Sequence, residues 1–396
     1  MTHPISTVHP GAIAADDDLA QVLDAEGERH PDPTLDPYIA DVDADLLRGL
    51  FTDMSIVRRL DREGVALQRQ GQLALWAPCL GQEAAQVGTG RALHAADFVF
   101  PSYREHGLAW VRGAAPVDLI RVWRGEENSS WDPAAVRMAP PQIIIGAQTL
   151  HAVGYAMGIQ RDAALERGGT AGAASPVEAA EREISVAYFG DGASSQGDVH
   201  EAMVFASSFR APVVFVCQNN HWAISEPVGV QARRPLAGRA PGYGIPSLRV
   251  DGNDVLACFA AMRWAADHAR SGRGPAYIEA VTYRMGPHTT ADDPTRYRRD
   301  AEVDRWGHRD PLARVERHLR AQGAFDDEVA ADVAARCDAL ARAVREAALT
   351  YRSRAPLAVF DDVYAEPHTA IARERAHFAA YLDGFVDAGH DGEDAR

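Results

Sequence analysis

Lysine is absent from this sequence of 396 residues, because all 40 of its basic side chains are arginine. A chain without lysine cannot hold pyridoxal phosphate as an internal Schiff base, and it cannot act as a lysine-dependent aldolase. It also cannot form the phosphate-binding loop that requires Gly-Lys-Ser or Gly-Lys-Thr. Genomic base composition is the simpler explanation of the bias, and these exclusions hold whatever its cause.

Cysteine and long apolar runs are also scarce. The four cysteines are Cys79, Cys217, Cys258 and Cys337, and no two of them form a CxxC pair. Such spacing fits a reducing cytoplasm and gives no support for a zinc or disulfide framework. The N-terminus lacks the basic and apolar segments of a signal peptide, and no apolar run approaches the ~20 residues of a membrane helix. We therefore expect a soluble, cytoplasmic protein.

The formal net charge of −16 argues against a nucleic acid or an anionic membrane as a partner. Most of this charge lies at the chain ends, because residues 1–44 contribute −9 and residues 384–396 contribute −3. The first 44 residues are also polar and interrupted by proline. We predict an acidic mobile arm over 1–44 and an acidic tail over 384–396.

Between these ends, short apolar strands alternate with helices, which indicates an α/β fold whose mostly parallel sheet is covered by helices on both faces. An amphipathic helix begins near Leu46, and the pattern after residue 310 is helical. We therefore predict an α/β domain over 45–310 and a helical C-terminal region over 311–383. The predicted strands and helices of the sheet region are Ile184–Phe189, Gly197–Phe209, Pro212–Cys217, Arg249–Val250, about 254–270 and Tyr277–Val281.

Polar residues follow the first two of these strands. Gly190-Asp191-Gly192 comes directly after one strand, and Asn219-Asn220 comes after the next. In a right-handed βαβ unit the two strand ends lie side by side, so Asp191 and Asn220 can both coordinate one hard divalent cation. Mg²⁺ prefers a few protein oxygens together with phosphate oxygens. The two glycines are expected to let the backbone turn sharply and approach a diphosphate.

A dinucleotide-binding fingerprint is the alternative interpretation. Gly190–Ser195 lacks the third glycine of GxGxxG, and its first variable position is a carboxylate that would face the phosphates. The acid expected at the next strand end is replaced by Gln218-Asn219-Asn220. A nicotinamide cofactor is therefore less consistent with these residues than a metal–diphosphate group. Two turns that share this spacing by chance remain the third interpretation.

Gly-Asp-Gly, 26 further residues and Asn-Asn together resemble the thiamine-diphosphate signature. Other stretches resemble the alpha subunit of the decarboxylating component of 2-oxo acid dehydrogenase complexes, of the branched-chain 2-oxo acid or pyruvate type, from about residue 45 to 366. These stretches are LQRQGQLALW (67–76), GQEAAQVG (81–88), SYREHG (102–107), PQIIIGAQ (141–148), YFGDGASSQGDVHEAMVFAS (188–207), QNNHWAIS (218–225), APGYGIPSLRVDGND (240–254), YRMGPHTTADDPTRYR (283–298) and FDDVYAE (360–366).

The resemblance implies a thiamine-diphosphate-binding fold and roles for the residues in its motifs. It implies that Asp191, Asn220 and the carbonyl of Trp222 bind Mg²⁺. It also implies that Tyr103 and Arg104 bind the diphosphate, a task that suits the bidentate guanidinium of arginine. The other cofactor-binding residues that it implies are Ile143 and Ile145, whose backbone would hold the aminopyrimidine, and Gly192, Ala193 and Gln218 beside the diphosphate.

Several further residues follow from the same motifs. His288 matches the histidine of the family's active-site loop, and we expect it to contact the cofactor or the substrate as a catalytic residue. His106 could instead cap or pack beside Tyr103 and Arg104. Some relatives have arginine at the position of Gln218, so the diphosphate site of this chain would carry less charge. Thr289 and Thr290 stand where animal relatives have a phosphorylated serine, but the sequence implies no kinase.

The resemblance implies oxidative decarboxylation of a 2-oxo acid, with acyl transfer to the lipoyl group of an acyltransferase component. A 2-oxo acid can lose CO₂ only if the resulting carbanion is delocalised, and without lysine a thiamine cofactor is the fitting electron sink. In the family, a beta subunit contributes the glutamate that activates the aminopyrimidine, so we expect a heterotetramer of two alpha and two beta subunits. The predicted substrate is a branched-chain 2-oxo acid such as 2-oxoisovalerate, with pyruvate and acetoin as alternative substrates. Two other classes of protein also remain as alternatives, a nicotinamide-dependent dehydrogenase and a regulatory scaffold that keeps the fold without the metal.

Overall fold

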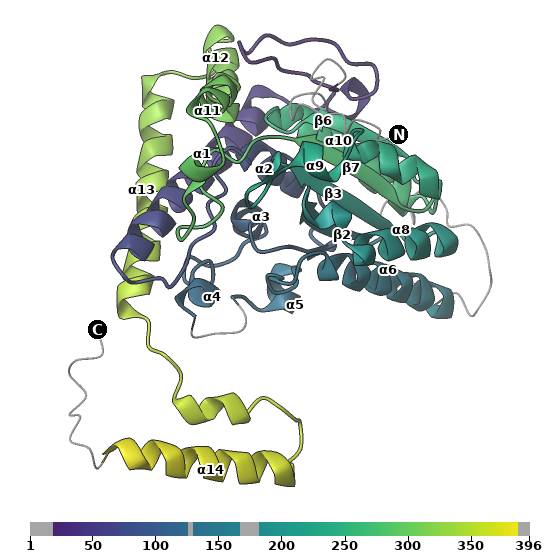
Figure 1. Ribbon diagram of the computed structural model, residues 1–396. Coiled ribbons are helices and arrows are strands. Elements are labelled where there is room, and N and C mark those ends of the chain that lie inside the picture. The colour runs from purple at the N-terminus through teal and green to yellow at the C-terminus, as the bar shows by residue number, and fades with distance from the viewer. Residues whose placement is uncertain (1–18, 126–129, 167–181, 387–396) are drawn as a thin grey trace, which may run out of the picture. The chain divides into compact units, whose positions relative to one another are not determined.

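Five short strands form one parallel sheet in the computed structural model of the chain, which describes residues 19–125, 130–166 and 182–386 (Figure 1). Four of these strands match the predicted ones. The strand β1 was not predicted, because three residues at the sheet edge are too short to give a periodic pattern. In spatial order the strands are β1 (Phe98–Phe100), β2 (Ser185–Gly190), β3 (Val213–Asn219), β7 (Ala276–Val281) and β6 (Ser247–Asp251).

Helices cover both faces of this sheet, as the continuous apolar strands predicted. Successive residues of β2 point to opposite faces, so Val186 and Tyr188 belong to one hydrophobic cluster and Ala187 and Phe189 belong to another. The first cluster includes residues of α2 (Glu83–Arg91) and α10 (Val255–Arg270), and the second includes residues of α6 (Ala147–Glu166) and α8 (Gly197–Phe209). Figure 1 shows α6 and α8 lying together along one face of the sheet.

The long helix α1 (Ala44–Arg69) begins at a side-chain cap, where Asp43 accepts a hydrogen bond from the backbone N–H of Leu46 at 2.8 Å. The apolar face of α1 packs on the core and on α12 (Pro311–Ala321). The helices α12 and α13 (Asp327–Thr350) therefore lie in the same compact unit as the sheet, which extends to Leu349. The boundary predicted between 310 and 311 does not separate two units, because helical pattern alone does not reveal what a helix packs against.

The N-terminal segment differs from the predicted mobile arm. Val22, Leu23 and Leu35 are buried in the main hydrophobic cluster. The backbone N–H groups of Val22 and Leu23 both donate to Oδ2 of Asp254, at 2.6 and 2.7 Å. The mobile-arm prediction is therefore wrong for residues 19–43. A few apolar residues hold this segment on the core although its composition is acidic. Residues 1–18 of the predicted arm lie outside the described residues.

A second unit comprises Thr350–Arg396, of which residues up to 386 are described. It contains η6 (Pro356–Phe360) and α14 (Thr369–Val386), whose Arg375 donates to the carbonyl of Leu357 at 3.0 Å. The predicted acidic tail lies largely outside the described residues. No helix within the described ranges is long and apolar enough to cross a membrane.

Shorter helices and strands complete the described part of the chain. They are η2 (Asp36–Tyr38), α3 (His106–Val111), α4 (Arg121–Arg124), α5 (Pro133–Val136), η3 (Ala193–Ser195), β4 (Trp222–Ala223), β5 (Glu226–Pro227), α9 (Val228–Gln231), η4 (Leu236–Tyr243), η5 (Pro294–Arg296) and α11 (Asp300–Gly307).

Candidate functional site

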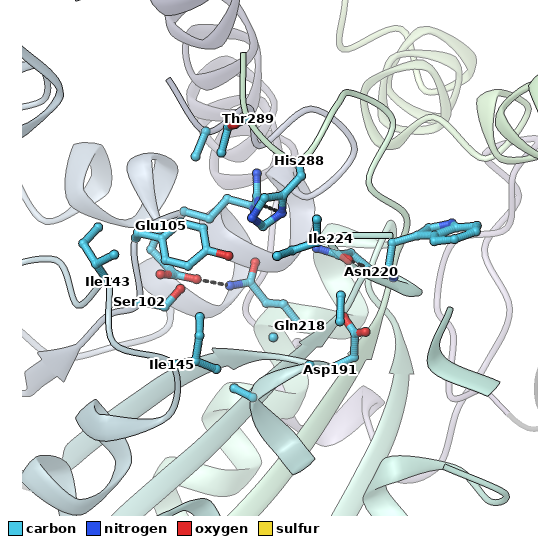
Figure 2. Close-up of a pocket in the computed structure, with 18 of the residues that line it drawn as sticks. Ser102, Glu105, Ile143, Ile145, Asp191, Gln218, Asn220, Ile224, His288 and Thr289 are labelled. Atoms are coloured by element: carbon cyan, nitrogen blue, oxygen red, sulfur yellow. Dashed lines mark hydrogen bonds between the residues drawn. The ribbon is translucent and has the colours of Figure 1, made fainter. Parts of the chain in front are cut away.

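A cavity of about 470 Å³ lies at the carboxyl ends of β2 and β3 (Figure 2). Parallel α/β sheets commonly bind ligands at this edge. The structure brings every predicted cofactor and metal residue to this one cavity. The predicted residues that line it are Tyr103, Arg104, Ile143, Ile145, Asp191, Gly192, Ala193, Gln218, Asn220, Trp222 and His288.

Asp191 follows the last residue of β2 and is almost fully buried. Its Oδ2 atom has no hydrogen-bond partner among the described residues. Burial raises the pKa of the Asp191 carboxyl to about 6, although Arg284 and nearby backbone N–H groups lower it. A buried carboxylate oxygen without a partner is costly, so this atom is suited to a cation.

Asn220 follows β3 and is also buried. Its Nδ2 atom donates to Oε1 of Gln82 at 2.7 Å, and its Oδ1 atom accepts from the backbone N–H of Trp222 at 3.2 Å. The carbonyl of Trp222 accepts from Arg284 at 3.1 Å. Each of these two oxygens has a second lone pair for a cation. Between them His221 has a φ of 69°, a left-handed conformation that is uncommon for residues other than glycine and frequent at functional sites.

Gly192 is required by close packing. A Cβ atom at this position would lie 2.7 Å from Cβ of Ala223, whereas a Cβ atom at Gly190 would meet nothing within 4 Å. Neither glycine has a positive φ. The predicted turn is present at Asp191 and Gly192, but it does not use a positive φ, and steric space explains only Gly192.

Two guanidinium groups concentrate positive charge beside the cavity. Arg104 donates to the carbonyl of Pro78 at 2.6 Å and to Nδ1 of His288 at 3.1 Å. The fully buried Arg284 donates to the carbonyl of Ile224 at 2.7 Å and lies 3.4 Å from the same His288 atom. Within the described residues, neither guanidinium forms an ion pair with a carboxylate within 4.0 Å. This arrangement is suited to an anion.

His288 is neutral in this setting. Burial, followed by the charges of Arg104 and Arg284, lowers the pKa of His288 to about 3. Because a guanidinium can only donate, Nδ1 of His288 accepts and the ring proton lies on Nε2. The backbone N–H of His288 donates to Asp292 at 2.7 Å, which fixes the loop. His288 therefore offers an Nε2–H donor rather than a positive charge.

His106 supports the cavity wall and does not line the main cavity. Its ring stacks on Trp76 with centroids 4.2 Å apart, and its Nε2 atom bonds to the carbonyl of Ala77 at 2.9 Å. Burial lowers the pKa of His106 to about 4. Thr289 lines the cavity, whereas Thr290 pairs with the backbone of Trp76. Sequence could place these residues near the site but could not separate lining from support.

Glu105 and Gln82 are functional candidates that the sequence analysis missed. Both are buried and line the cavity. Each lies inside a matched motif, SYREHG for Glu105 and GQEAAQVG for Gln82, which was the available signal. Gln218, predicted to line the diphosphate, bonds to both of them.

The rest of the cavity is mainly apolar. The tip of the Gln142–Gly146 segment is exposed, with 59% of Ile143 and 72% of Ile144 accessible. Within the described residues, no three His, Cys, Asp or Glu side chains gather as metal ligands. A cation at this cavity would therefore depend on one carboxylate together with amide and carbonyl oxygens. The apolar side chains that line the cavity include Leu75, Ala77, Trp123, Ile143, Ile145 and Ile224.

Comparison with known proteins shows the family of the chain. The dehydrogenase E1 component family matches residues 52–354. The chain is 46% identical over 346 residues to the 3-methyl-2-oxobutanoate dehydrogenase subunit alpha of Mycobacterium tuberculosis, covering 87% of this chain and 90% of the relative. It is 36% identical over 359 residues to the pyruvate dehydrogenase E1 component subunit alpha of Staphylococcus epidermidis, covering 90% and 91%. The Bacillus cereus protein of that name is 39% identical over 321 residues, covering 80% and 81%. The chain belongs to the dehydrogenase E1 component family.

Proposed function

We propose that this chain is the alpha subunit of a thiamine-diphosphate-dependent dehydrogenase that oxidatively decarboxylates a branched-chain 2-oxo acid. The proposal is supported best by two arginines and one aspartate near the same cavity whose charges lack an opposite charge or a hydrogen bond. Arg104 and Arg284 have no carboxylate partner in the described part of the chain, and Asp191 has a buried oxygen without a hydrogen bond. A diphosphate bound through a divalent cation satisfies both requirements.

The residues at the cavity fit Mg²⁺. Asp191 would supply a carboxylate oxygen, Asn220 an amide oxygen and Trp222 its backbone carbonyl. Mg²⁺ accepts such hard oxygen ligands and leaves further positions to phosphate oxygens and water. This donor set contains no sulfur or imidazole, which argues against zinc.

The remaining residues would bind and orient the cofactor. Bound thiamine diphosphate supplies the electron sink that a 2-oxo acid needs to lose CO₂. Tyr103 and Arg104 would bind its diphosphate, beside Gly192 and Ala193. The backbone of Ile143 and Ile145 would hold the aminopyrimidine. His288 would donate its Nε2–H to a phosphate or substrate oxygen.

The site needs a partner subunit. Asp191 and Glu105 are the two carboxylates among the described lining residues. Asp191 is assigned to the cation, and Glu105 accepts a hydrogen bond from Gln218. Neither is left to activate the aminopyrimidine, so we expect a beta subunit to contribute that glutamate in a heterotetramer of two alpha and two beta subunits. A lipoyl-bearing acyltransferase component would then receive the acyl group. The four buried free cysteines are consistent with activity in the cytoplasm.

The substrate proposal depends on identity and on the apolar lining. The relative named for 3-methyl-2-oxobutanoate is 46% identical, against 36% and 39% for the two relatives named for pyruvate. Leu75, Trp123 and Ile224 provide apolar surface that suits a branched acyl group better than a methyl group. Pyruvate remains the second candidate.

Cofactor titration of the chain, coexpressed with its beta subunit, tests the proposal. Calorimetry with thiamine diphosphate should show binding that requires Mg²⁺, and NAD⁺ should not bind at this site. Binding of NAD⁺ in place of thiamine diphosphate would favour the nicotinamide alternative. Binding of neither cofactor would favour a scaffold that has lost the site.

A further inference from the structure

Four buried side chains form a continuous chain of hydrogen bonds beneath the cavity. Gln218 donates to Oε1 of Glu105 at 2.7 Å, and Gln82 donates to Oε1 of Gln218 at 3.2 Å. Asn220 in turn donates to Oε1 of Gln82 at 2.7 Å. All four residues are buried, with between 1% and 6% of each residue exposed to solvent. Figure 2 shows the bond between Gln218 and Glu105.

All three amide groups donate in one direction, toward Glu105. Oε1 of Glu105 accepts from Gln218, and an ionised carboxylate can only accept, whereas an amide both donates and accepts. Burial raises the pKa of Glu105, while hydrogen bonds from Ser102 and Gln218 and the charge of Arg104 act in the opposite direction and favour the ionised form. The carboxylate of Glu105 therefore requires the NH₂ group of Gln218, which leaves the Gln218 oxygen to accept from Gln82. The oxygen of Gln82 then accepts from the NH₂ group of Asn220. The oxygen of Asn220 takes no part in the chain of hydrogen bonds.

We infer that Glu105 is a positioning residue that fixes the amide orientation of Asn220, through Gln218 and Gln82, so that Asn220 presents oxygen rather than NH₂ to the cation. This inference rests on the proposed function, because it needs Asn220 to bind Mg²⁺. The buried hydrogen-bond chain thus links the segment that carries Arg104, assigned to the diphosphate, to Asn220, assigned to the metal.

A local bond supports the same orientation. The oxygen of Asn220 accepts from the backbone N–H of Trp222 at 3.2 Å, a longer contact than the 2.7 Å bond to Gln82. Breaking the chain therefore weakens the preference and does not abolish it. Outer-shell partners of metal ligands typically change metal affinity about 10- to 100-fold, and we expect about tenfold here.

Three variants of the alpha subunit, each coexpressed with the beta subunit, test the inference. Glu105→Gln keeps the shape and removes the acceptor-only end. Glu105→Asp keeps the carboxylate but shortens the side chain. Gln82→Met keeps the charge of Glu105 and removes the hydrogen bonds in the middle of the chain. The readout is the Mg²⁺ concentration that gives half-maximal binding of thiamine diphosphate, measured by calorimetry, with circular dichroism to confirm folding.

The expected result is about a tenfold rise in this Mg²⁺ concentration for E105Q and Q82M, and a smaller rise for E105D. If the role were packing alone, the isosteric E105Q would be milder than E105D, and that order would overturn the inference. Wild-type Mg²⁺ dependence in both E105Q and Q82M would overturn it as well. A wild-type protein that binds thiamine diphosphate without Mg²⁺, or does not bind it, would instead refute the proposed function.

Discussion

Arg104, Arg284 and His288 show how this lysine-free chain forms an anion site. The two guanidinium groups share one imidazole acceptor, Nδ1 of His288. Because burial, followed by their charges, lowers the pKa of His288 to about 3, the imidazole is neutral at physiological pH. Positive charge beside the cavity therefore comes from arginine, and His288 adds a directional donor.

Asp191 is the residue whose removal should cost most. Asp191→Asn keeps the shape but halves the oxygen ligands and removes the charge. Loss of a direct ligand should weaken Mg²⁺-dependent thiamine diphosphate binding by at least about 100-fold, the upper end of outer-shell effects. Asp198→Asn, an exposed change on α8, is the matched control and should bind as the wild type does. Equal binding by both variants would contradict the metal role of Asp191.

His106 predicts a specific pH dependence of stability. Burial lowers its pKa from 6.5 to about 4, so the unfolded chain binds this proton more readily than the folded chain. The contribution to stability is complete above about pH 6.5 and is lost as the pH falls toward about 4. His106→Gln should make the decrease in the free energy of unfolding between about pH 7.5 and about pH 5 smaller by about 2 kcal/mol.

Chemical denaturation at the two pH values measures this difference. The comparison is between two conditions for one protein, so the lost stacking of His106 on Trp76 lowers stability at both values and largely cancels. An unchanged decrease in H106Q would contradict the neutral, buried imidazole.

At the scale of elements, the sequence predicted the positions of the main strands and helices of the sheet and the edge at which the motif residues meet. The bounds of α8 were predicted as Gly197–Phe209, and those of β2 and β3 within two residues, because short continuous apolar runs alternate with helical segments in this part of the chain. The motifs brought Asp191 and Asn220 to one sheet edge. Periodicity could not reveal β1 or the packing of residues 19–43. It also could not reveal the bonds of Glu105, since these depend on side chains that are distant in sequence.

Leu23 tests whether the N-terminal segment belongs to the fold. Its side chain is fully buried, and its carbonyl accepts a hydrogen bond from Arg314 at 2.8 Å. Leu23→Ala should lower the free energy of unfolding by about 2–5 kcal/mol, as large-to-small changes in a core do. Val230→Ala, at a position that is 68% exposed, is the control and should change it by less than about 0.5 kcal/mol. Equal small effects of both changes would support the original prediction of a mobile arm.

At the scale of the whole molecule, the acidic charge and the site occupy different parts of the chain. Of the formal charge of −16, residues 1–44 contribute −9 and residues 384–396 contribute −3. The family match, over 52–354, contains every residue assigned to the cofactor. Charge of one sign at the ends therefore bears on solubility and association rather than on the chemistry of the site.

Truncation separates the acidic ends from the fold. Deleting residues 1–18 together with 387–396 should leave Mg²⁺-dependent thiamine diphosphate binding within about twofold of the full chain, since these ranges lie outside the family match. Deleting residues 1–43 should also remove the buried Val22 and Leu23 and reduce the yield of folded protein. Calorimetry of the purified heterotetramers checks both, and lost affinity in the shorter deletion would contradict the account.

The ratio of kcat/KM values for two substrates shows whether the enzyme prefers a branched-chain 2-oxo acid. The reconstituted heterotetramer, with Mg²⁺ and thiamine diphosphate, is assayed for decarboxylation of 3-methyl-2-oxobutanoate and pyruvate side by side. An apolar pocket gains about 10- to 200-fold per additional methylene, so we predict at least about a tenfold preference for 3-methyl-2-oxobutanoate. A preference for pyruvate would contradict the branched-chain assignment, and no decarboxylation of either acid would contradict the proposed activity.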